Sequence, residues 1–399
     1  MTGLHSKRRI LVLGAGPLHK EHYRLMRGMG LGTVAMDRDP RAPARSEADV
    51  FCCADPGDVA QVIVAARKHD VDAILALSEF GVVPAAEASE RLGLPQIASE
   101  TAWALHDKTR TRRALARNGI PQPRFQIASS LAEAQSAATA FGLPLVVKPP
   151  ALSSARGVRV VERPQELPQA YEEAHAISPG ELLLEERIVG VETSVEGAVV
   201  EGKATVLACG DKDLRPHPRY RVTRSINYPA ALSDQQLTRI RGCAQAVMDA
   251  VGLRNSPFHL EVFVCGDRVL PIECAARGGG GHIYSHIVEL VSGQNLLRLA
   301  VQLLLGERPT VPEPEVSFGA CYRFLFPPEG RCRSVEGIKD VMENDRVVDL
   351  VIGVAPGTVI REPEHGAQRA GYLVTRGADR EEACAAADWA ESALRWERD

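Results

Sequence analysis

Short apolar runs alternate with helical segments through residues 1–100 of the chain. The runs lie at 9–13, 33–37 and 73–77, and each has the length and apolar character of a buried strand. Strands that alternate with helices build a parallel sheet with right-handed crossovers. We therefore predict an N-terminal βαβ domain over residues 1–100.

The pattern changes after residue 100. Residues 101–118 predict one charged helix, because Gly119 follows them and two prolines break the chain soon afterwards. Apolar runs at 143–149 and 181–189 predict strands, and residues 191–207 predict a hairpin. This middle part of the chain is therefore expected to combine helices with sheets of its own.

Later segments continue the mixed pattern. Residues 233–251 predict a helix, and residues 258–265 and 268–273 predict two strands paired around a Gly-Asp turn. A glycine tract, residues 278–281, then precedes a helix predicted at 282–305. Further strands are expected at 320–326 and 370–374.

Together these elements predict an α/β fold with three regions. The first is the N-terminal βαβ domain at 1–100. The second is a two-lobed domain at 101–310, divided into lobes at 101–190 and 191–310. The third is a small C-terminal α+β domain at 311–399.

Composition excludes several classes of protein. The chain has 399 residues, 45% of them apolar, and a formal net charge of −4, so neither nucleic acid nor an anionic membrane is expected as a partner. Its nine cysteines are odd in number and form no C-x-x-C pair, which predicts neither a disulfide framework nor a zinc site. No apolar window approaches the roughly 20 residues of a membrane span. A reducing cytoplasm is the expected location.

Lys148 lies inside an apolar strand and suggests a site for an anion. A buried ammonium group needs an anionic partner, although a lysine that snorkels to the surface is the alternative. A small loop follows at residues 153–157, with sequence SSARG. Such loops offer backbone N–H groups to phosphate oxygens, but they also serve as plain connections.

Acidic residues lie within and just after the apolar run at 181–189. Glu185 and Glu186 end that strand, and Glu192 comes shortly after a glycine. Surface charge is one explanation for them. The other is a nucleotide hinge, in which backbone and carboxylate groups take the adenine edge and Glu192 takes the ribose hydroxyls.

Glu261 and Glu273 carry the strongest signal. They lie on adjacent predicted strands, so their carboxylates come close on one face and repel unless a cation neutralises them. Oxygen ligands of this kind suit magnesium that bridges phosphates. Arg277 follows, and its planar guanidinium can hold a phosphoryl or carboxylate group with two hydrogen bonds. The alternative is a pair of exposed acids beside a surface arginine.

The ordered set of motifs resembles the ATP-grasp superfamily over most of the chain. The lysine strand, the Ser/Gly loop, the EERIVGVE hinge and the ECAAR segment occur in the order and spacing of that superfamily. Ser78-Glu79, FHLEVF and ECAARGGGGHI look most similar to its L-amino acid ligase branch. The resemblance implies an ADP-forming ligase that joins a carboxylate to an amine through an acyl phosphate, with ATP and Mg²⁺ or Mn²⁺ as cofactors.

The resemblance also implies a role for each matching residue. It assigns the ATP phosphates to Lys108 and Lys148, and a mobile lid to the loop with Ser153, Ser154 and Gly157. It assigns the adenine pocket to Glu185, Glu186 and Ile188, and the ribose to Glu192. It assigns the metal to Glu261 and Glu273, and the acyl phosphate or the substrate carboxylate to Arg277. Glu79, which follows the third strand, is the candidate for the ammonium group of an amino-acid substrate.

One position departs from the superfamily pattern. Many members carry Asn two residues after the second metal-binding Glu, and Ala275 stands there in this chain. A methyl group cannot bind a metal ion. A second magnesium ion would therefore depend on Glu273, phosphates and water.

Three further features admit plainer explanations. Gly14-Ala15-Gly16 after the first strand suggests a dinucleotide site, but His19 stands where the third glycine belongs, and a tight βα turn is the favoured interpretation. His259 is expected to be a hydrogen-bonded neighbour of the metal site rather than a ligand. The basic residues at 215–224 are either a solvated loop or a clamp for an acidic substrate.

Two rival functions share much of this evidence. One is a biotin-carboxylase-like or purine-pathway-like ligase that uses bicarbonate or formate. The other is a non-catalytic ATP-binding module, which the retained acidic and basic residues argue against. Small-molecule substrates are the expected partners, and the sequence leaves a homodimer open.

Overall fold

Four β-sheets organise the part of the chain that the structure describes. This computed structural model describes residues 7–153, 155–216, 220–314 and 318–399. The first sheet is parallel, with the order β3-β2-β1-β4. Its strands are β1 (Arg9–Leu13), β2 (Gly32–Asp37), β3 (Val50–Cys53) and β4 (Ala73–Ala76), and its helices are α1 (Lys20–Gly28), α2 (Val59–Lys68) and α3 (Glu79–Leu92). The parallel sheet confirms the βαβ arrangement predicted at the N-terminus.

Strand β3 was not predicted from the sequence. It is short, and its residues are half-buried or exposed at the edge of the sheet. The run VFCC therefore lacks the buried neighbours that make the other three strands recognisable as apolar segments.

A second, four-stranded sheet with the order β5-β8-β6-β7 forms the first lobe of the middle region. All its pairs are antiparallel. Its strands are β5 (Phe125–Ala128), β6 (Leu145–Lys148), β7 (Arg159–Val161) and β8 (Leu182–Glu186), and helices α6 (Leu131–Phe141) and α7 (Leu167–Ile177) pack on it through one apolar cluster.

The single helix predicted at 101–118 is wrong, because the chain forms two helices there. They are α4 (Ser99–His106) and α5 (Lys108–Arg117), and they meet at Asp107. Asp107 has extended backbone angles, and its side chain accepts hydrogen bonds from the N–H groups of Thr109 and Arg110. An aspartate that caps a new helix in this way ends the preceding one.

The largest sheet has eight strands in the order β13-β12-β9-β10-β11-β14-β18-β16. They are β9 (Val191–Val200), β10 (Lys203–Leu214), β11 (Thr223–Tyr228), β12 (Ser256–Cys265), β13 (Arg268–Ala275), β14 (Gly319–Leu325), β16 (Val347–Ile352) and β18 (Gly371–Gly377). Helix α8 (Asp234–Val251) packs on β10 and β13, and it begins and ends as predicted, at Ser233 and Gly252. The sheet runs through the boundary that we predicted at residue 310, so β14, β16 and β18 continue the sheet of the second lobe.

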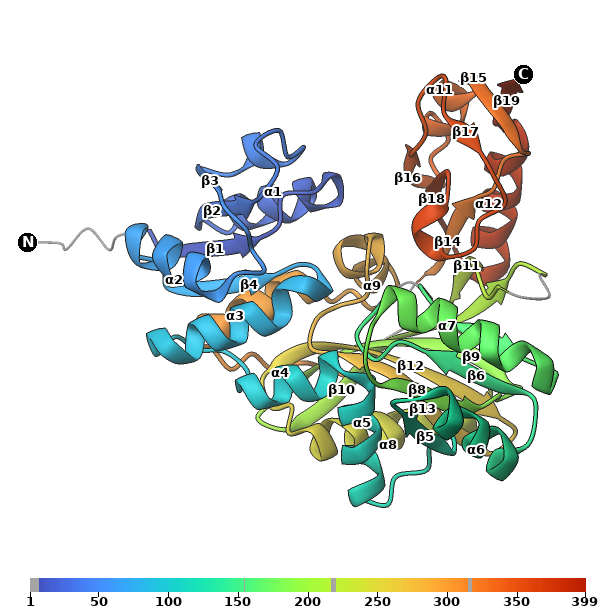
Figure 1. Ribbon diagram of the computed structural model, residues 1–399. Coiled ribbons are helices and arrows are strands. Elements are labelled where there is room, and N and C mark those ends of the chain that lie inside the picture. The colour runs from blue at the N-terminus through green and yellow to red at the C-terminus, as the bar shows by residue number, and fades with distance from the viewer. Residues whose placement is uncertain (1–6, 154, 217–219, 315–317) are drawn as a thin grey trace, which may run out of the picture.

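The remaining C-terminal elements surround the far end of that sheet. They are the three-stranded sheet of β15 (Gly330–Glu336), β17 (Val359–Ile360) and β19 (Arg395–Arg398), with helices α11 (Ile338–Met342) and α12 (Arg380–Ala393). Figure 1 shows these elements and the N-terminal sheet rising on two sides of the molecule, with α9 between them.

The helix predicted at 282–305 is interrupted. A π-helical turn, η4 (Ile283–Ile287), leads into α9 (Val288–Ser292), and α10 (Leu296–Leu304) follows separately. Gly293 ends α9 with a left-handed backbone, and the side chain of Asn295 caps α10. The sequence is apolar on both sides of the break, because both helices are buried on several sides. The apolar pattern therefore gave no sign that the helix is interrupted.

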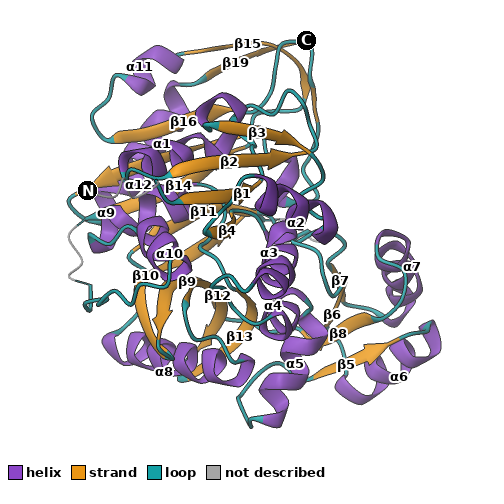
Figure 2. Ribbon diagram, turned by 90° about the vertical axis from the view of Figure 1, so that its left-hand side faces the viewer, coloured by secondary structure: helices purple, strands orange, loops and turns teal. Residues whose placement is uncertain are grey.

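One hydrophobic core joins elements that are distant in sequence. It contains Ile10 and Leu75 of the N-terminal sheet, Val288 and Leu296 of the interrupted helices, and Val374 of β18. The N-terminal sheet and the C-terminal strands therefore share a core with the segment after the glycine tract. Figure 2 shows the first-lobe sheet beside β13, with α4 and α5 between them.

Within the described residues, no single helix has both the length and the apolar character of a membrane span. One pair bent by 113°, Ile283–Ser292 with Leu296–Leu304, meets these conditions only when its two parts are added together.

Gly197 provides a test of how closely the central strands pack. A Cβ atom at this position of β9 would lie 2.2 Å from the Thr205 carbonyl oxygen of β10 and 2.5 Å from the Phe258 ring. We expect Gly197→Ala to lower the free energy of unfolding by roughly 1–3 kcal/mol, because overpacking a filled site strains the backbone. Gly242→Ala is the matched control, since nothing lies within 4 Å of that position on α8. It should raise stability by about 0.5–1 kcal/mol. Equal effects of the two substitutions in urea unfolding would contradict this packing.

Candidate active site

The carboxylates of Glu261 and Glu273 face each other across the β12–β13 hairpin. The two residues are directly paired in the register, and a β-bulge follows immediately after Glu261. Their side chains are 20% and 27% exposed. The cross-strand placement predicted from the sequence is therefore confirmed, and both carboxylates lie at a part-buried site rather than on an open surface.

Lysines from two other segments neutralise this pair. Lys212 of β10 places its Nζ 2.5 Å from Glu261 Oε1 and 2.9 Å from Glu192 Oε1. Lys108, at the start of α5, places its Nζ 3.4 Å from Glu273 Oε1. Each of the paired carboxylates thus has an ammonium group within ion-pair distance.

His259 connects Glu261 to a second buried acid. Its Nδ1 lies 2.6 Å from Glu196 Oε1, and its Nε2 lies 3.3 Å from Glu261 Oε1. Burial alone would lower the pKa of His259, but Glu196 and Glu261 outweigh it and raise the pKa to about 9. Glu196 also accepts the backbone N–H of Gly279, which ties the start of the glycine tract to the same network.

Lys148 is buried and pairs with Glu185. Its Nζ lies 2.6 Å from Glu185 Oε2, and the Nε of Arg112 lies 2.5 Å from the other oxygen. Burial lowers the pKa of Lys148, and the charge of Glu185 acts against it. Burial alone would raise the pKa of Glu185, but the charges of Arg112 and Lys148 outweigh it and hold the pKa at about 2.

Arg112 also joins the two lobes. Besides Glu185 of β8, its guanidinium donates to the carbonyl oxygens of Pro271 at 2.9 Å and Ile272 at 3.1 Å. These carbonyls belong to β13, the strand that carries Glu273. One buried side chain therefore fixes the lysine strand of the first lobe relative to the acidic hairpin of the second.

Arg277 and Glu79 form an ion pair with each other. The Nε and Nη2 of Arg277 both lie 2.8 Å from Glu79 Oε2, and His106 Nδ1 lies 3.3 Å from Glu79 Oε1. Burial favours the neutral form of Glu79, but Arg277, His106 and Lys108 outweigh it and hold the pKa at about 2. The two residues that we assigned to substrate thus meet, although they are far apart in sequence.

The predicted lid and hinge are less completely defined. Ser153 and Gly157 lie in a loop after β6, whereas Ser154 lies outside the described residues. Gly157 has a φ of +73°, and a Cβ there would lie 2.7 Å from Pro149. In the hinge, Glu186 pairs with Arg124 at 2.7 Å, and Ile188 is half-buried.

The hinge carboxylates have protein partners. Glu185 pairs with Arg112 and Lys148, and Glu192 pairs with Lys212 and with Arg221 at 3.2 Å. The anionic partner that Lys148 needs is therefore supplied by the protein itself. The N–H groups of Glu186 and Arg187 donate to the carbonyl oxygens of Arg124 and Pro144. The assignments of the hinge residues to ATP stay predictions.

Sequence reasoning missed Lys212, Arg112 and Glu196. Lys212 lies beyond residue 207, where the predicted hairpin stopped, and the observed β10 continues to Leu214. Alternation along the whole strand could have revealed it as an inward-facing lysine. Arg112 and Glu196 gave no local signal, because their partners lie on other elements.

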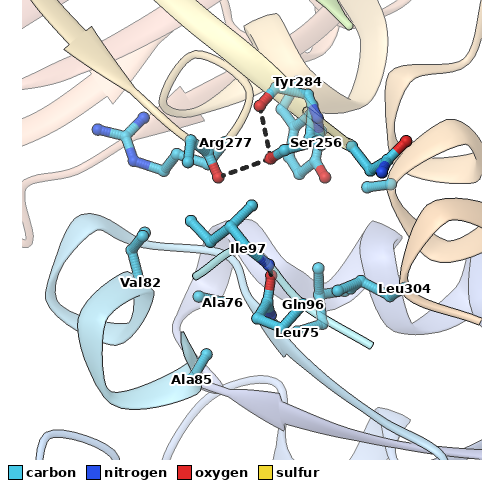
Figure 3. A pocket seen from close by; sticks show the side chains of 14 residues that line it. Leu75, Ala76, Val82, Ala85, Gln96, Ile97, Ser256, Arg277, Tyr284 and Leu304 are labelled. Carbon is cyan, nitrogen blue, oxygen red and sulfur yellow. Dashed lines mark hydrogen bonds between the residues drawn. The ribbon is translucent and has the colours of Figure 1, made fainter. Parts of the chain in front are cut away.

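The cavity beside Arg277 is too small for a substrate. It has a volume of about 30 Å³, and its lining includes Val82, Ile97 and Leu304. Figure 3 shows these apolar side chains on one side, with the guanidinium end of Arg277 pointing away from them. Such a space holds one or two water molecules at most. The polar groups described above, rather than this cavity, define the candidate site.

The residues of the Gly14-Ala15-Gly16 motif contact other residues of the protein. Asp37 accepts a hydrogen bond of 2.8 Å from the N–H of Ala15, and the ring of His19 lies against Gly14. These contacts agree with a tight βα turn. The basic segment has acidic partners for Arg215, Arg221 and Arg224, and its residues 217–219 lie outside the described part of the chain.

The donor set fits a divalent cation held together with a phosphorylated ligand. Glu261 and Glu273 offer hard oxygen ligands on facing strands. In the described ranges, no group of three or more His, Cys, Asp or Glu side chains forms a metal site. Two carboxylates completed by phosphate oxygens and water are the usual environment of Mg²⁺. Ala275 lies opposite His259 in the register and contributes no ligand.

Sequence models of three domain families match the chain. They are the ATP-grasp domain at residues 141–286, the ATP-grasp N-terminal domain at 30–96 and the L-amino acid ligase C-terminal domain 2 at 323–398. A formate-dependent phosphoribosylglycinamide formyltransferase of Synechococcus sp. (strain CC9902) is 28% identical over 97% of this chain and 96% of its own.

Solved structures share the fold. The L-amino acid ligase from Bacillus licheniformis superposes with a TM-score of 0.84 at 22% identity, over 98% of this chain and 99% of its own. The phosphoribosylglycinamide synthetase from Anaerococcus prevotii superposes with a TM-score of 0.79 at 17% identity, over 99% and 100% of the two chains. The predicted α/β fold is confirmed.

Glu185 should be essential for stability even without ligand. Glu185→Gln leaves the charges of Lys148 and Arg112 buried together, so we expect unfolding free energy to fall by roughly 3–5 kcal/mol. The neighbouring Glu186→Gln breaks a more exposed pair with Arg124 and should change stability by at most about 1 kcal/mol. Denaturant unfolding of both variants in the absence of nucleotide measures the difference. Similar small losses in both variants would show that the buried triad is not a stabilising unit.

Proposed function

We propose that this chain, which belongs to the ATP-grasp superfamily, is an ADP-forming ligase that joins the carboxylate of an amino acid to an amine. The three matching domain models and the shared fold establish the superfamily. The choice of an amino acid as the carboxylate substrate rests on the site itself.

The ion pair between Arg277 and Glu79 is the observation that carries this proposal. A zwitterionic amino acid has one carboxylate and one ammonium group, and this pair offers one charge of each sign, 2.8 Å apart. An incoming amino acid can exchange the protein ion pair for two intermolecular ones, with its carboxylate on Arg277 and its ammonium on Glu79. Because both side chains are more than four-fifths buried, these contacts form away from bulk water.

Lys108, which we assign to the ATP phosphates, lies next to this pair. The charge of Lys108 lowers the pKa of Glu79, and the same ammonium group lies 3.4 Å from Glu273. Its Nζ also donates to the carbonyl of Leu152, which immediately precedes the Ser/Gly loop. Lys108 is thus in a position to contact a phosphoryl group that approaches between the loop and the acidic hairpin.

Positioning and charge compensation are the contributions of the protein to the reaction. Lys108 and Lys148 offset negative charge on the nucleotide, and Arg277 orients the attacking carboxylate toward the terminal phosphorus. When bound, Mg²⁺ on Glu261 and Glu273 would neutralise charge on the phosphates. Arg277 then holds the acyl phosphate while the amine attacks, and exclusion of water protects that intermediate.

Formate or bicarbonate as the carboxylate is the second candidate. The formyltransferases that share 28% identity over nearly the whole chain use formate by name, which favours this alternative. A one-carbon acid has no ammonium group, so it would leave Glu79 without a contact to the carboxylate substrate. The two candidates therefore differ in what they require of Glu79.

Phosphate release over a panel of carboxylates and amines, with mass spectrometry of the products, tests the proposal. Amino-acid pairs should accelerate ADP release, and each ADP should accompany one new amide bond. Glu79→Gln should raise the KM for the amino acid by roughly 10-fold or more, because it removes a charged hydrogen-bond partner, and should leave the KM for ATP unchanged. Activity with formate or bicarbonate alone would reject the amino acid in favour of the second candidate.

Glu273 should be required for the metal-dependent step. Glu273→Gln removes one of two facing carboxylates, and turnover should fall by roughly 10²-fold or more, with a higher Mg²⁺ concentration needed for half-maximal rate. Asp267→Asn in the turn of the same hairpin removes an acid that is 79% exposed and serves as the control, with near-normal activity expected. A Glu273→Gln enzyme with normal turnover and normal Mg²⁺ dependence would refute the metal assignment.

A further inference from the structure

Helix α12 packs along strand β14, and the two elements run in the same direction (Figure 1). At one end, a Cβ atom on Gly319 would collide with the carbonyl oxygen of Asp379. At the other end, Arg323 Nη2 lies 2.8 Å from Asp388 Oδ1. Four steps along a strand and nine along a helix both cover about 13 Å, so the elements stay in step between these contacts. Cys321 of β14 and Cys384 of α12 lie at the level midway between them.

The side chains of Cys321 and Cys384 face each other at that level. Their thiols are hydrogen-bonded to one another, and both residues belong to the apolar cluster between α12 and the sheet. Cys321 is fully buried, and its Sγ also lies 3.3 Å from Asn227 Oδ1 of β11. Cys384 is half-buried. A small reagent in solvent can therefore reach Cys384, whereas Cys321 is shielded.

Small side chains bring the helix close to the sheet around this pair. Helix α12 buries Ala383, Ala387 and Ala390 in the same cluster. Thr375 of β18 donates from its Oγ1 to the carbonyl oxygen of Ala383 at 2.7 Å, which requires a close approach of the helix to the sheet. A disulfide needs Cα atoms within about 4–7 Å of each other, a separation that alanine-lined packing permits and larger side chains would prevent.

Two arginines flank the pair and make its two sulfurs unequal. The hydrogen bond from Cys321 lowers the pKa of Cys384, and the charges of Arg380 and Arg323 lower it further, against the effect of burial. The hydrogen bond to Cys384 and burial raise the pKa of Cys321 well above its usual range. The negative charge of the pair therefore lies on the more accessible sulfur, and the thiolate is the form that attacks oxidants.

We propose that Cys384 and Cys321 form a site of reversible oxidation, at which hydrogen peroxide converts the two thiols into a disulfide that fixes α12 to β14. The Cys384 thiolate attacks one peroxide oxygen, the O–O bond breaks, and the released hydroxide takes up the proton that Cys384 had lost. The sulfur of Cys321 then attacks the resulting sulfenic acid. The S–S bond forms, the S–O bond breaks, and the second hydroxide takes the proton of Cys321. Two thiols are oxidised, and one peroxide is reduced to two water molecules.

The disulfide would fix a helix that is connected to the candidate active site. Arg380, on the same helix as Cys384, places its Nη2 2.7 Å from Asp211 Oδ2 of β10. The next residue of β10 is Lys212, which pairs with Glu261. A tether between α12 and β14 therefore secures the contact of the helix with the strand that carries Lys212. This inference does not depend on the identity of the substrates.

Peptide mapping of the folded wild type tests the site. Fully reduced protein is treated with one equivalent of hydrogen peroxide, the remaining thiols are blocked with N-ethylmaleimide, and the digest is analysed by mass spectrometry with and without dithiothreitol. We expect a pair of peptides joined through Cys321 and Cys384 that separates on reduction. The oxidised protein should also unfold at a temperature several degrees higher than the reduced protein, because the cross-link closes a long loop.

Two variants separate the attacking thiol from the resolving thiol. In Cys321→Ala, Cys384 should accumulate as a sulfenic acid, and dimedone should label it roughly 10-fold faster than Cys53 of the same protein, because more of it is thiolate. Cys53 is the matched control, since its side chain is exposed and its sulfur contacts the carbonyl oxygen of Arg38. In Cys384→Ala, Cys321 should stay unlabelled.

The mapping of the wild type decides the question whether or not the variants fold. Disulfides that join other cysteines, or recovery of Cys321 and Cys384 as maleimide adducts while Cys53 is oxidised, would refute the site. An oxidised protein that carries the expected link but unfolds no later than the reduced protein would refute the tether. Equal labelling of Cys321 in Cys384→Ala and of Cys384 in Cys321→Ala would refute the assigned roles of the two thiols.

Discussion

Mutual neutralisation of buried charges is the constraint on which this structure depends. Lys148, Arg112 and Glu185 have almost no contact with solvent, and none of them could remain charged in that environment without the others. Arg112 is central, because it holds Glu185 and also two carbonyl groups of β13. The requirement to satisfy this guanidinium therefore sets the spacing between the two lobes.

The same principle organises the charged side chains of the candidate site. Lys212 and Lys108 form ion pairs with the facing carboxylates of Glu261 and Glu273, and Arg277 forms one with Glu79. A cation and a phosphorylated nucleotide can enter by exchanging partners, because the charges they need are already in place. The side chains lose little further conformational freedom on binding, which is the benefit of preorganisation.

The N-terminal and C-terminal regions contribute to the site through one shared core. Buried residues of β1, α9 and β18 pack in a single cluster, so the glycine tract is held between the two regions. His282, the residue after the tract, lies 2.7 Å from the Tyr372 hydroxyl and 3.0 Å from Asp349, which anchors that segment to the C-terminal strands. The C-terminal strands thus anchor the segment after the glycine tract as well as continuing the central sheet.

Local features of the sequence predicted much of this arrangement. The hairpin that pairs Glu261 with Glu273 could be predicted because a two-residue turn fixes its register. The break at Asp107 and the edge strand β3 could not, because capping geometry and edge position leave little trace in apolar periodicity. Arg112 and Glu196 were missed because their partners lie on distant segments, which a single sequence does not report. Lys212 was missed because the predicted hairpin stopped at residue 207 and the strand continues to Leu214. The roles assigned to individual residues remain predictions.

Transfer of oxygen from the substrate carboxylate to phosphate tests the central claim most directly. The amino acid is supplied with ¹⁸O in its carboxylate, the reaction is run with ATP, Mg²⁺ and an amine, and the released phosphate is analysed by mass spectrometry. Attack of that carboxylate on the terminal phosphorus predicts one ¹⁸O atom in each phosphate, together with ADP. Label found in AMP, or phosphate without label in a reaction that forms the amide, would contradict the account.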